Sequence, residues 1–282
     1  MSRTRVFALT LLSMLAFAGN SLLCRAALSA TRIDAASFTS IRIASGAVAL
    51  WFILRMRSGP HALAGNWPSA FALFAYAAAF SFSYVNLTAA TGALLLFGAV
   101  QTTMIGYGVW VGERFRLWQI AGLLCALAGL VGLVLPGLAA PPLHAAALML
   151  AAGVAWGVYS VRGKGAGDPL RVTAGNFLRA VAFAVALSIV MLPWASLDRT
   201  GVGYAIASGA LTSGVGYAVW YTALAGLNVT RAATVQLSVP VIAAVGGVLL
   251  LGEPVTLRLV LASAAILGGI ALVIAGKHSV RR

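Results

Sequence analysis

Acidic residues, histidines and cysteines are all scarce in this sequence, and their scarcity limits the chemistry available to it. Only 5 of 282 residues are Asp or Glu, against 19 Lys and Arg, and there are 3 His and 2 Cys. Two cysteines do not make a disulfide framework. A hydrolase needs a nucleophile with a base, or a set of metal ligands, and neither an HExxH nor a GxSxG motif occurs. The sequence therefore predicts no enzyme activity, no cofactor and no metal site.

Charge of either sign is also low, because charged residues make up 9% of the chain and hydrophobic residues 61%, with a mean hydropathy of +0.99. A soluble fold cannot bury that much apolar surface. Runs such as 89–111 and 239–251 are apolar on every side, whereas strands of a membrane β-barrel alternate in polarity. Helices satisfy their own backbone in lipid. The predicted class is an all-α polytopic membrane protein, with the lipid bilayer as its partner.

Ten transmembrane helices are predicted from the apolar runs and the Pro/Gly punctuation between them. The first follows Arg3 and Arg5 as a signal peptide would, but no small-x-small cleavage site precedes a soluble domain, so we expect a retained helix. The predicted spans are 6–24, 37–54, 68–86, 90–111, 117–135, 144–161, 171–193, 201–224, 230–251 and 256–276.

The basic residues are segregated between the two sides of this predicted topology. Four lie on one side, at 25, 32, 199 and 258, and two, Arg42 and Arg179, lie inside spans. Thirteen lie on the other side, at 3, 5, 55, 57, 114, 116, 162, 164, 171, 231, 277, 281 and 282. The positive-inside rule then predicts that the N- and C-termini are both cytoplasmic. Because the cations lie between spans and form no stripe with aromatics, the net charge of +14 does not indicate nucleic-acid binding.

The chain repeats itself once. Gly112-Glu113 and the apolar run after it return as Gly252-Glu253 and another apolar run, 140 residues later. Arg42 near the start of the second predicted helix likewise corresponds to Arg179 near the start of the seventh. Each half, 1–138 and 139–282, therefore holds five spans. Because five is odd, the second half enters the membrane from the opposite face, and such inverted repeats suit alternating access around a midplane site.

These residues resemble the EamA-type transporters of the drug/metabolite transporter superfamily. The shared marks are a Gly in the first helix of each repeat, an Arg in the second and a Gly-Glu after the fourth. Here they are Gly19 and Trp156-Gly157, Arg42 and Arg179, and Gly112-Glu113 and Gly252-Glu253-Pro254. Pro240 matches the family's Pro in the fourth helix of the last repeat, whereas Val100-Gln101 stands at the equivalent place in the first.

Within that superfamily the chain is most similar to bacterial exporters of aromatic and other amino acids. The resemblance implies that the first, third, fourth, sixth, eighth and ninth helices surround the substrate path. Polar and aromatic side chains near the midplane of these helices are the candidates for contact with a small-molecule substrate. They are Asn20, Tyr76, Gln101, Trp156, Tyr159, Ser213, Tyr217, Trp220, Gln236 and Ser238. As a group they favour a central cavity; singly, each is equally well explained by packing between helices.

A second set of residues is predicted to have gating or structural roles. Glu113 and Glu253 lie just before helices, where a carboxylate is stabilised by the positive N-terminal end, and a gating role is the alternative. Arg42 and Arg179 can either snorkel to the headgroups or pair with a neighbouring helix. Pro240, in the middle of the ninth predicted helix, can form a static kink or a hinge.

The sequence thus predicts an alternating-access exporter or facilitator of amino acids, aromatic or neutral, and of related small metabolites. Because all five acids fall at helix ends or in loops, we expect weak ion coupling and neutral or zwitterionic solutes. The alternatives are export of another small metabolite or drug within the same superfamily, and a channel-like facilitator. No oligomeric state is indicated.

Overall fold

Ten helical spans lie side by side in the computed structural model, which describes residues 1–57, 62–112, 117–135, 137, 140–163, 166–227, 232 and 235–276. The first seven are α1 (Arg3–Ala30), α2 (Ala35–Met56), α3 (Trp67–Tyr84), α4 (Ala89–Trp110), α5 (Leu117–Val134), α6 (Leu143–Gly163) and α7 (Pro169–Val190). After the short helix η1 (Leu192–Trp194), α8 (Arg199–Ile206), η2 (Ala207–Val215) and α9 (Gly216–Leu224) form the eighth span, followed by α11 (Ser238–Leu251) and α12 (Leu257–Gly276).

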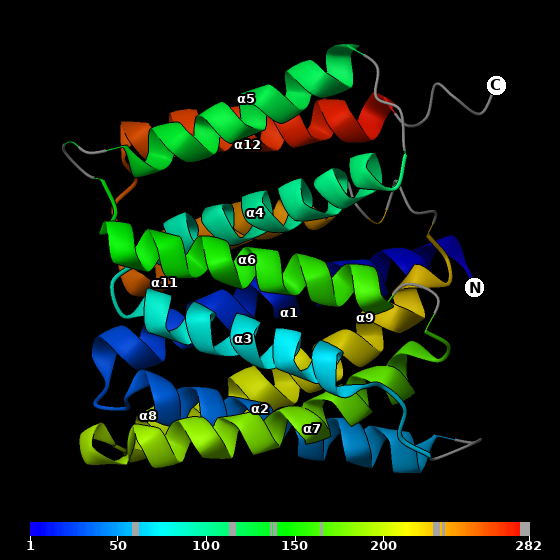
Figure 1. Ribbon diagram of the computed structural model, residues 1–282, viewed down its shortest axis with the longest axis vertical. Coiled ribbons are helices and arrows are strands. Elements are labelled where there is room, and N and C mark those ends of the chain that lie inside the picture. Colours follow the sequence, from blue (N-terminus) through cyan, green and yellow to red (C-terminus); the bar gives the residue numbers. More distant parts are fainter. Residues whose placement is uncertain are drawn as a thin grey trace.

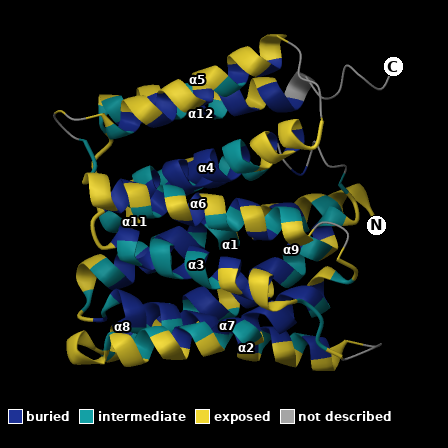
Figure 2. Cartoon of the chain, viewed as in Figure 1, coloured by how far each residue is buried: buried dark blue, intermediate teal, exposed yellow. Residues whose placement is uncertain are grey.

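The predicted fold class is confirmed, since the described residues form helices and no strand. Within that part of the chain, eight helices are long and apolar enough to cross a membrane. Large apolar side chains remain exposed along the outward faces of α5, α6 and α7, where lipid would cover them (Figure 2). Trp51, Trp67, Trp110, Trp118 and Trp194 are all exposed, as residues of an interfacial aromatic belt are.

Polar side chains begin several of the helices. The carboxylates of Asp34, Asp168 and Asp198 accept backbone N–H groups in the first turns of α2, α7 and α8, and the Asn66 side chain does the same for α3. These bonds satisfy donors that a helix leaves free at its N-terminus. Three of the scarce acids are therefore used to define where spans begin.

The two halves of the chain interleave, so that helices of one half pack against helices of the other. Each of α2, α4 and α5 packs against its own counterpart, α7, α11 and α12 respectively. In the same way, α3 packs against α6 as η2 and α9 pack against α1. In Figure 1, α4 ends at the end of the bundle where α1 begins, whereas α11 ends at the opposite end. Counterpart helices thus run in opposite directions, as inverted repeats require; the division between residues 138 and 139 stays a prediction.

Small residues allow the closest of these contacts. A Cβ added to Gly122 of α5 would lie 2.6 Å from the carbonyl oxygen of Gly269 in α12, and one added to Gly269 would lie 2.4 Å from that of Gly122. Such glycines let two backbones approach within a membrane, where apolar burial does little to hold helices together. The pair α5 and α12 forms one side of the bundle (Figure 1).

Two local features differ from the predicted helices. The eighth span changes to a π-helix over Ala207–Val215, which the apolar pattern does not signal. The ninth described helix begins at Ser238, so Pro240 lies in its first turn and not in its middle. Residues 235 and 236, immediately upstream, are also helical and are separated from α11 by a turn at Leu237, so the helical path is interrupted just before Pro240, and its role as a static kink or a hinge stays a prediction.

Candidate functional site

Seven of the side chains singled out in the sequence meet inside the bundle. They come from α1, α2, α3, α6 and α9, and all except Trp156, which is half-buried, are buried. We call them the central cluster: Asn20, Arg42, Tyr76, Trp156, Tyr159, Tyr217 and Trp220.

Tyr76 connects the polar members of the cluster. Its hydroxyl oxygen accepts from Nη2 of Arg42 at 3.0 Å and from Nδ2 of Asn20 at 3.3 Å. The Asn20 carbonyl oxygen in turn accepts from the hydroxyls of Ser208 at 2.7 Å and Thr212 at 3.4 Å. Both hydroxyls come from the π-helix η2, and Asn20 is therefore satisfied from two helices at once.

The structure decides between the two roles left open for Arg42. Its side chain is only 2% exposed, and its guanidinium carbon lies 5.2 Å from the ring centroid of Tyr76 and 4.9 Å from that of Phe80. In this structure Arg42 thus pairs with α3, one of the two arrangements that the sequence left open. A positive charge at the centre of the bundle is the main feature that the sequence-based description of the midplane lacks.

Aromatic rings form the other part of the cluster. The Trp156 ring lies 4.8 Å from that of Tyr76, and it stacks on Tyr159 at 5.2 Å and on Tyr217 at 5.4 Å with an interplanar angle of 17°. Phe17, which no pattern in the sequence singled out, links Tyr217 to Trp220. Stacked and edge-on rings of this kind present flat apolar surfaces with a few polar edges.

A short polar chain continues from this stack toward α7 and α9. The Tyr159 hydroxyl donates to Thr173 Oγ1 at 3.5 Å, and that oxygen lies 2.9 Å from the hydroxyl of Tyr221. Asn176, on the same helix as Thr173, accepts from the backbone N–H of Asn66. The chain joins one hydroxyl each from α6, α7 and α9, so no spacing within a single apolar span indicates it.

The remaining candidates lie elsewhere. Gln101 and Ser213 are buried and Gln236 is half-buried, but the described residues show no hydrogen bond from them to the central cluster. The Ser238 hydroxyl donates to the carbonyl oxygen of Val235, which lies before the first residue of α11. Glu113 lies outside the described residues.

Arg179, the counterpart of Arg42 in the second half, has a different environment. Its Nη1 donates to the carbonyls of Ala64 at 2.8 Å and Gly175 at 2.9 Å, at the end of the bundle where α3 begins. The same sequence mark therefore has two different structural roles, one central and one peripheral.

Glu253 bridges three parts of the chain at the opposite end. Its Oε1 forms an ion pair with Nε of Arg25 at 3.0 Å, and its Oε2 accepts from the backbone N–H of Ala89, the first residue of α4, at 2.8 Å. Nη1 of Arg25 also donates to the carbonyls of Tyr84 and Val85. Glu253 thus contacts the N-terminus of α4 and not, as predicted, that of the helix which follows it.

Loops of the two halves are bonded to each other at both ends. At one end Asp34 Oδ2 accepts from the backbone N–H of Ser196 at 2.9 Å. Partial burial acts to raise the pKa of Asp34, yet hydrogen bonds from Ser37, Ser196 and Ala36 hold that pKa below its usual value. At the other end Arg57 pairs with Asp168 at 2.6 Å. These contacts join the regions around α2 and α7 at each end of the bundle.

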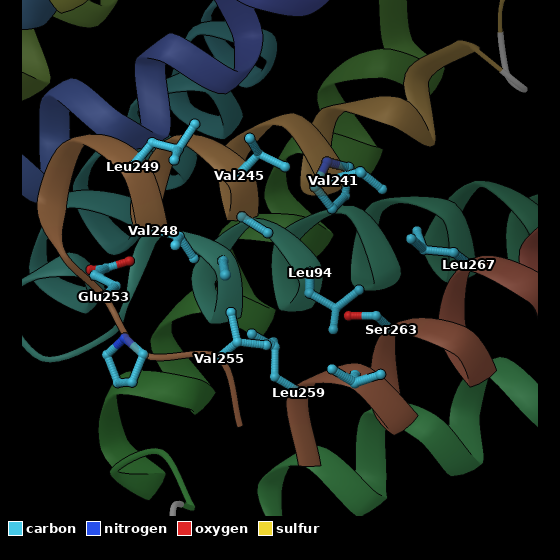
Figure 3. A pocket seen from close by; sticks show the side chains of 15 residues that line it. Leu94, Val241, Val245, Val248, Leu249, Glu253, Val255, Leu259, Ser263 and Leu267 are labelled. Atoms are coloured by element: carbon cyan, nitrogen blue, oxygen red, sulfur yellow. The ribbon is translucent and has the colours of Figure 1, made fainter. Parts of the chain in front are cut away.

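An apolar groove of about 390 Å³ lies apart from the cluster, between α4, α11 and α12 (Figure 3). Aliphatic side chains such as Leu94, Val245 and Leu259 line it, and Glu253 lies at its edge. A solute site needs a few convergent polar groups to orient its ligand. The central cluster has such groups, and this groove is lined mainly by hydrocarbon.

The side chains of the central cluster are of kinds that bind a solute through hydrogen bonds, charge and ring contacts. In the described part of the chain, no group of three or more His, Cys, Asp or Glu is placed to hold a metal ion. What the cluster offers is a buried cation, an amide, hydroxyls and aromatic faces, reached by helices from both halves. A polytopic bundle of inverted repeats with such a centre defines a class, the membrane transporters of small solutes.

Comparison with known proteins identifies the family within that class. The model of the EamA-like transporter family matches residues 143–275. An uncharacterized protein of Pseudomonas aeruginosa is 58% identical over 272 residues, which cover 96% of this chain and 95% of that protein. The chain belongs to the EamA-like transporter family, and it is therefore a membrane transporter.

Two further proteins are similar to this chain. A protein of Archaeoglobus fulgidus named as an uncharacterized transporter is 27% identical over 176 residues, which cover 59% of this chain and 60% of that protein. A crystal structure of a protein that is 20% identical superimposes over 100% of both chains with a TM-score of 0.67. At that identity the structural match shows a shared fold.

Proposed function

We propose that this transporter moves amino acids, aromatic or neutral, and related small metabolites out of a bacterial cytoplasm by alternating access. The observation that supports the proposal is the central cluster, where Trp156 lies between the rings of Tyr76, Tyr159 and Tyr217 beside the polar groups of Asn20 and Arg42. Ring faces suit an apolar or aromatic side chain, and the polar groups suit a solute's charged end.

The proposed orientation has both termini in the cytoplasm and the protein in the inner membrane. It is supported by the excess of Lys and Arg at one end of the bundle, including Arg3, Arg5, Arg55 and Arg57. The two repeats, 1–138 and 139–282, would then rock about the cluster and expose it to either side in turn.

A competition assay in proteoliposomes tests the substrate class. We expect uptake of labelled phenylalanine to be saturable and to be inhibited by unlabelled Trp, Phe and Tyr. Trp156→Leu should weaken the apparent affinity by about 2–10-fold, the worth of lost ring contacts, whereas Trp110→Leu, at an exposed position on α4, should not.

If none of the three amino acids competes or moves, the amino-acid assignment is wrong, although family membership stands. Flux that neither saturates nor responds to solute on the far side would favour a channel-like facilitator.

A further inference from the structure

The buried guanidinium of Arg42 has an unused donor. Its Nη2 is bonded to the Tyr76 hydroxyl, but its Nη1 is buried and has no hydrogen-bond partner among the residues that the structure describes. Arginine carries five N–H donors in a planar fork that matches a carboxylate. A buried donor without an acceptor costs free energy, so this atom marks a place where an acceptor belongs.

The charge of Arg42 also lacks a counter-charge among the described residues. All four acids that the structure describes are bonded at helix ends: Asp34 to Ser196, Asp168 to Arg57, Asp198 to Arg32 and Glu253 to Arg25. An uncompensated charge inside a membrane protein is costly, and such residues are typically functional. We therefore expect an anion from outside the chain to neutralise the Arg42 cation of the described cluster.

The neighbours of Arg42 indicate what else that anion should carry. The rings of Tyr76 and Phe80 lie next to the guanidinium, and Trp156 lies against Tyr76; such ring surfaces suit an apolar body. By contrast, no described carboxylate lies in the cluster to bind an ammonium group. The charges of the described cluster are thus matched to the carboxylate end of an amino acid and not to its ammonium end.

We propose that Arg42 binds the carboxylate of the transported solute, with Tyr76 and Trp156 against its apolar body, so that the protein accepts small organic carboxylates without an ammonium group. This rests on the proposed function and narrows it. The site discriminates through a charge-assisted contact from Nη1 of Arg42 to the carboxylate, and an amino acid binds because of its carboxylate.

Two half-analogues of phenylalanine test the assignment by isothermal titration calorimetry on the purified full-length protein. 3-Phenylpropionate keeps the carboxylate and phenethylamine keeps the ammonium. We expect 3-phenylpropionate to bind wild type at least about tenfold more tightly than phenethylamine. Arg42→Gln should weaken 3-phenylpropionate binding by about 10–100-fold, the worth of a charged hydrogen bond. Arg42→Lys, which keeps the charge but not the fork, should weaken it less.

Arg55→Gln is the matched control, because Arg55 lies on the same helix but packs over the exposed ring of Trp51; its binding should equal wild type. Elution as a single species and an unchanged unfolding temperature establish that each variant is folded. If Arg42→Gln does not fold, the affinities of wild type for the two analogues and the affinity of Arg42→Lys for 3-phenylpropionate still test whether Arg42 binds the carboxylate.

The assignment is overturned if the two analogues bind wild type equally well, if neither binds, or if folded Arg42→Gln binds 3-phenylpropionate as wild type does. Two other outcomes distinguish a failure of the Arg42 assignment from a failure of the proposed amino-acid transport. Phenylalanine flux inhibited by phenethylamine and not by 3-phenylpropionate would leave transport standing and remove Arg42 from it. Arg42-dependent binding of 3-phenylpropionate without phenylalanine flux would leave the carboxylate site standing and remove the amino-acid assignment.

Discussion

At the scale of single residues, position in the bundle decides roles that sequence leaves open. Arg42 and Arg179 carry the same mark at corresponding places, yet one bonds to a tyrosine hydroxyl in the core and the other to backbone carbonyls at the end. The difference comes from the acceptors that neighbouring helices present. Those acceptors lie 34 residues from Arg42 and 115 from Arg179, so no local pattern reveals them.

Gly209 gives a prediction at this scale, because it sits where η2 meets α2 beside Arg42. A Cβ there would lie 2.1 Å from the carbonyl oxygen of Arg42 and 2.0 Å from Ser45 Oγ. We expect Gly209→Ala to destabilise the protein by about 1–3 kcal/mol, the cost of overpacking. Gly203→Ala is the control, since a Cβ on Gly203 in α8 meets nothing within 4 Å. Thermal unfolding in detergent compares them, and equal unfolding temperatures would mean that this helix contact is not tight.

At the scale of elements, most spans were predictable because a membrane-crossing helix is apolar along its own length. Helix ends were predictable where a capping residue such as Asp34 or Asp168 stands before the span. The π-helix and the start of α11 were not. In the π-helix, Ser208 and Thr212 donate hydrogen bonds to Asn20 of another helix, and α11 begins only two residues before Pro240. Hydropathy along the chain indicates neither feature.

The bridge between Arg25 and Glu253 yields a prediction about how elements are held together. Its side chains are 20% and 9% exposed, whereas those of Arg57 and Asp168 are 53% and 27% exposed. A double-mutant cycle of Arg25→Gln and Glu253→Gln, measured by unfolding, should give a coupling of about 1–3 kcal/mol. The cycle of Arg57→Gln and Asp168→Asn should give less than about 1 kcal/mol, as exposed pairs do. Equal couplings would show that Glu253 acts mainly as the acceptor for the N-terminus of α4.

At the scale of the whole molecule, the parity of the spans and the repeated marks predicted the inverted halves. The contacts that join those halves were not predictable. The Arg25–Glu253 pair is 228 residues apart and the Asn20–Ser208 bond 188 apart, and each depends on the register of helices that no single repeat contains. The central cluster was therefore predictable as a set of residue types at midplane depth, but its buried cation was not.

The opposite directions of α4 and α11 give the last prediction. Val111 follows α4 and Val255 follows α11, both are exposed, and the two helices end at opposite ends of the bundle (Figure 1). In a background without the native Cys24 and Cys125, Val111→Cys and Val255→Cys should react with a membrane-impermeant maleimide from opposite sides. Because the described arginines Arg3 and Arg5, at the start of α1, lie at the end where α4 finishes, Val111→Cys should be labelled in inside-out vesicles and Val255→Cys in intact cells. Labelling of both from one side would contradict the inverted arrangement, because two helices that end on the same side of a bilayer cannot belong to repeats of opposite direction.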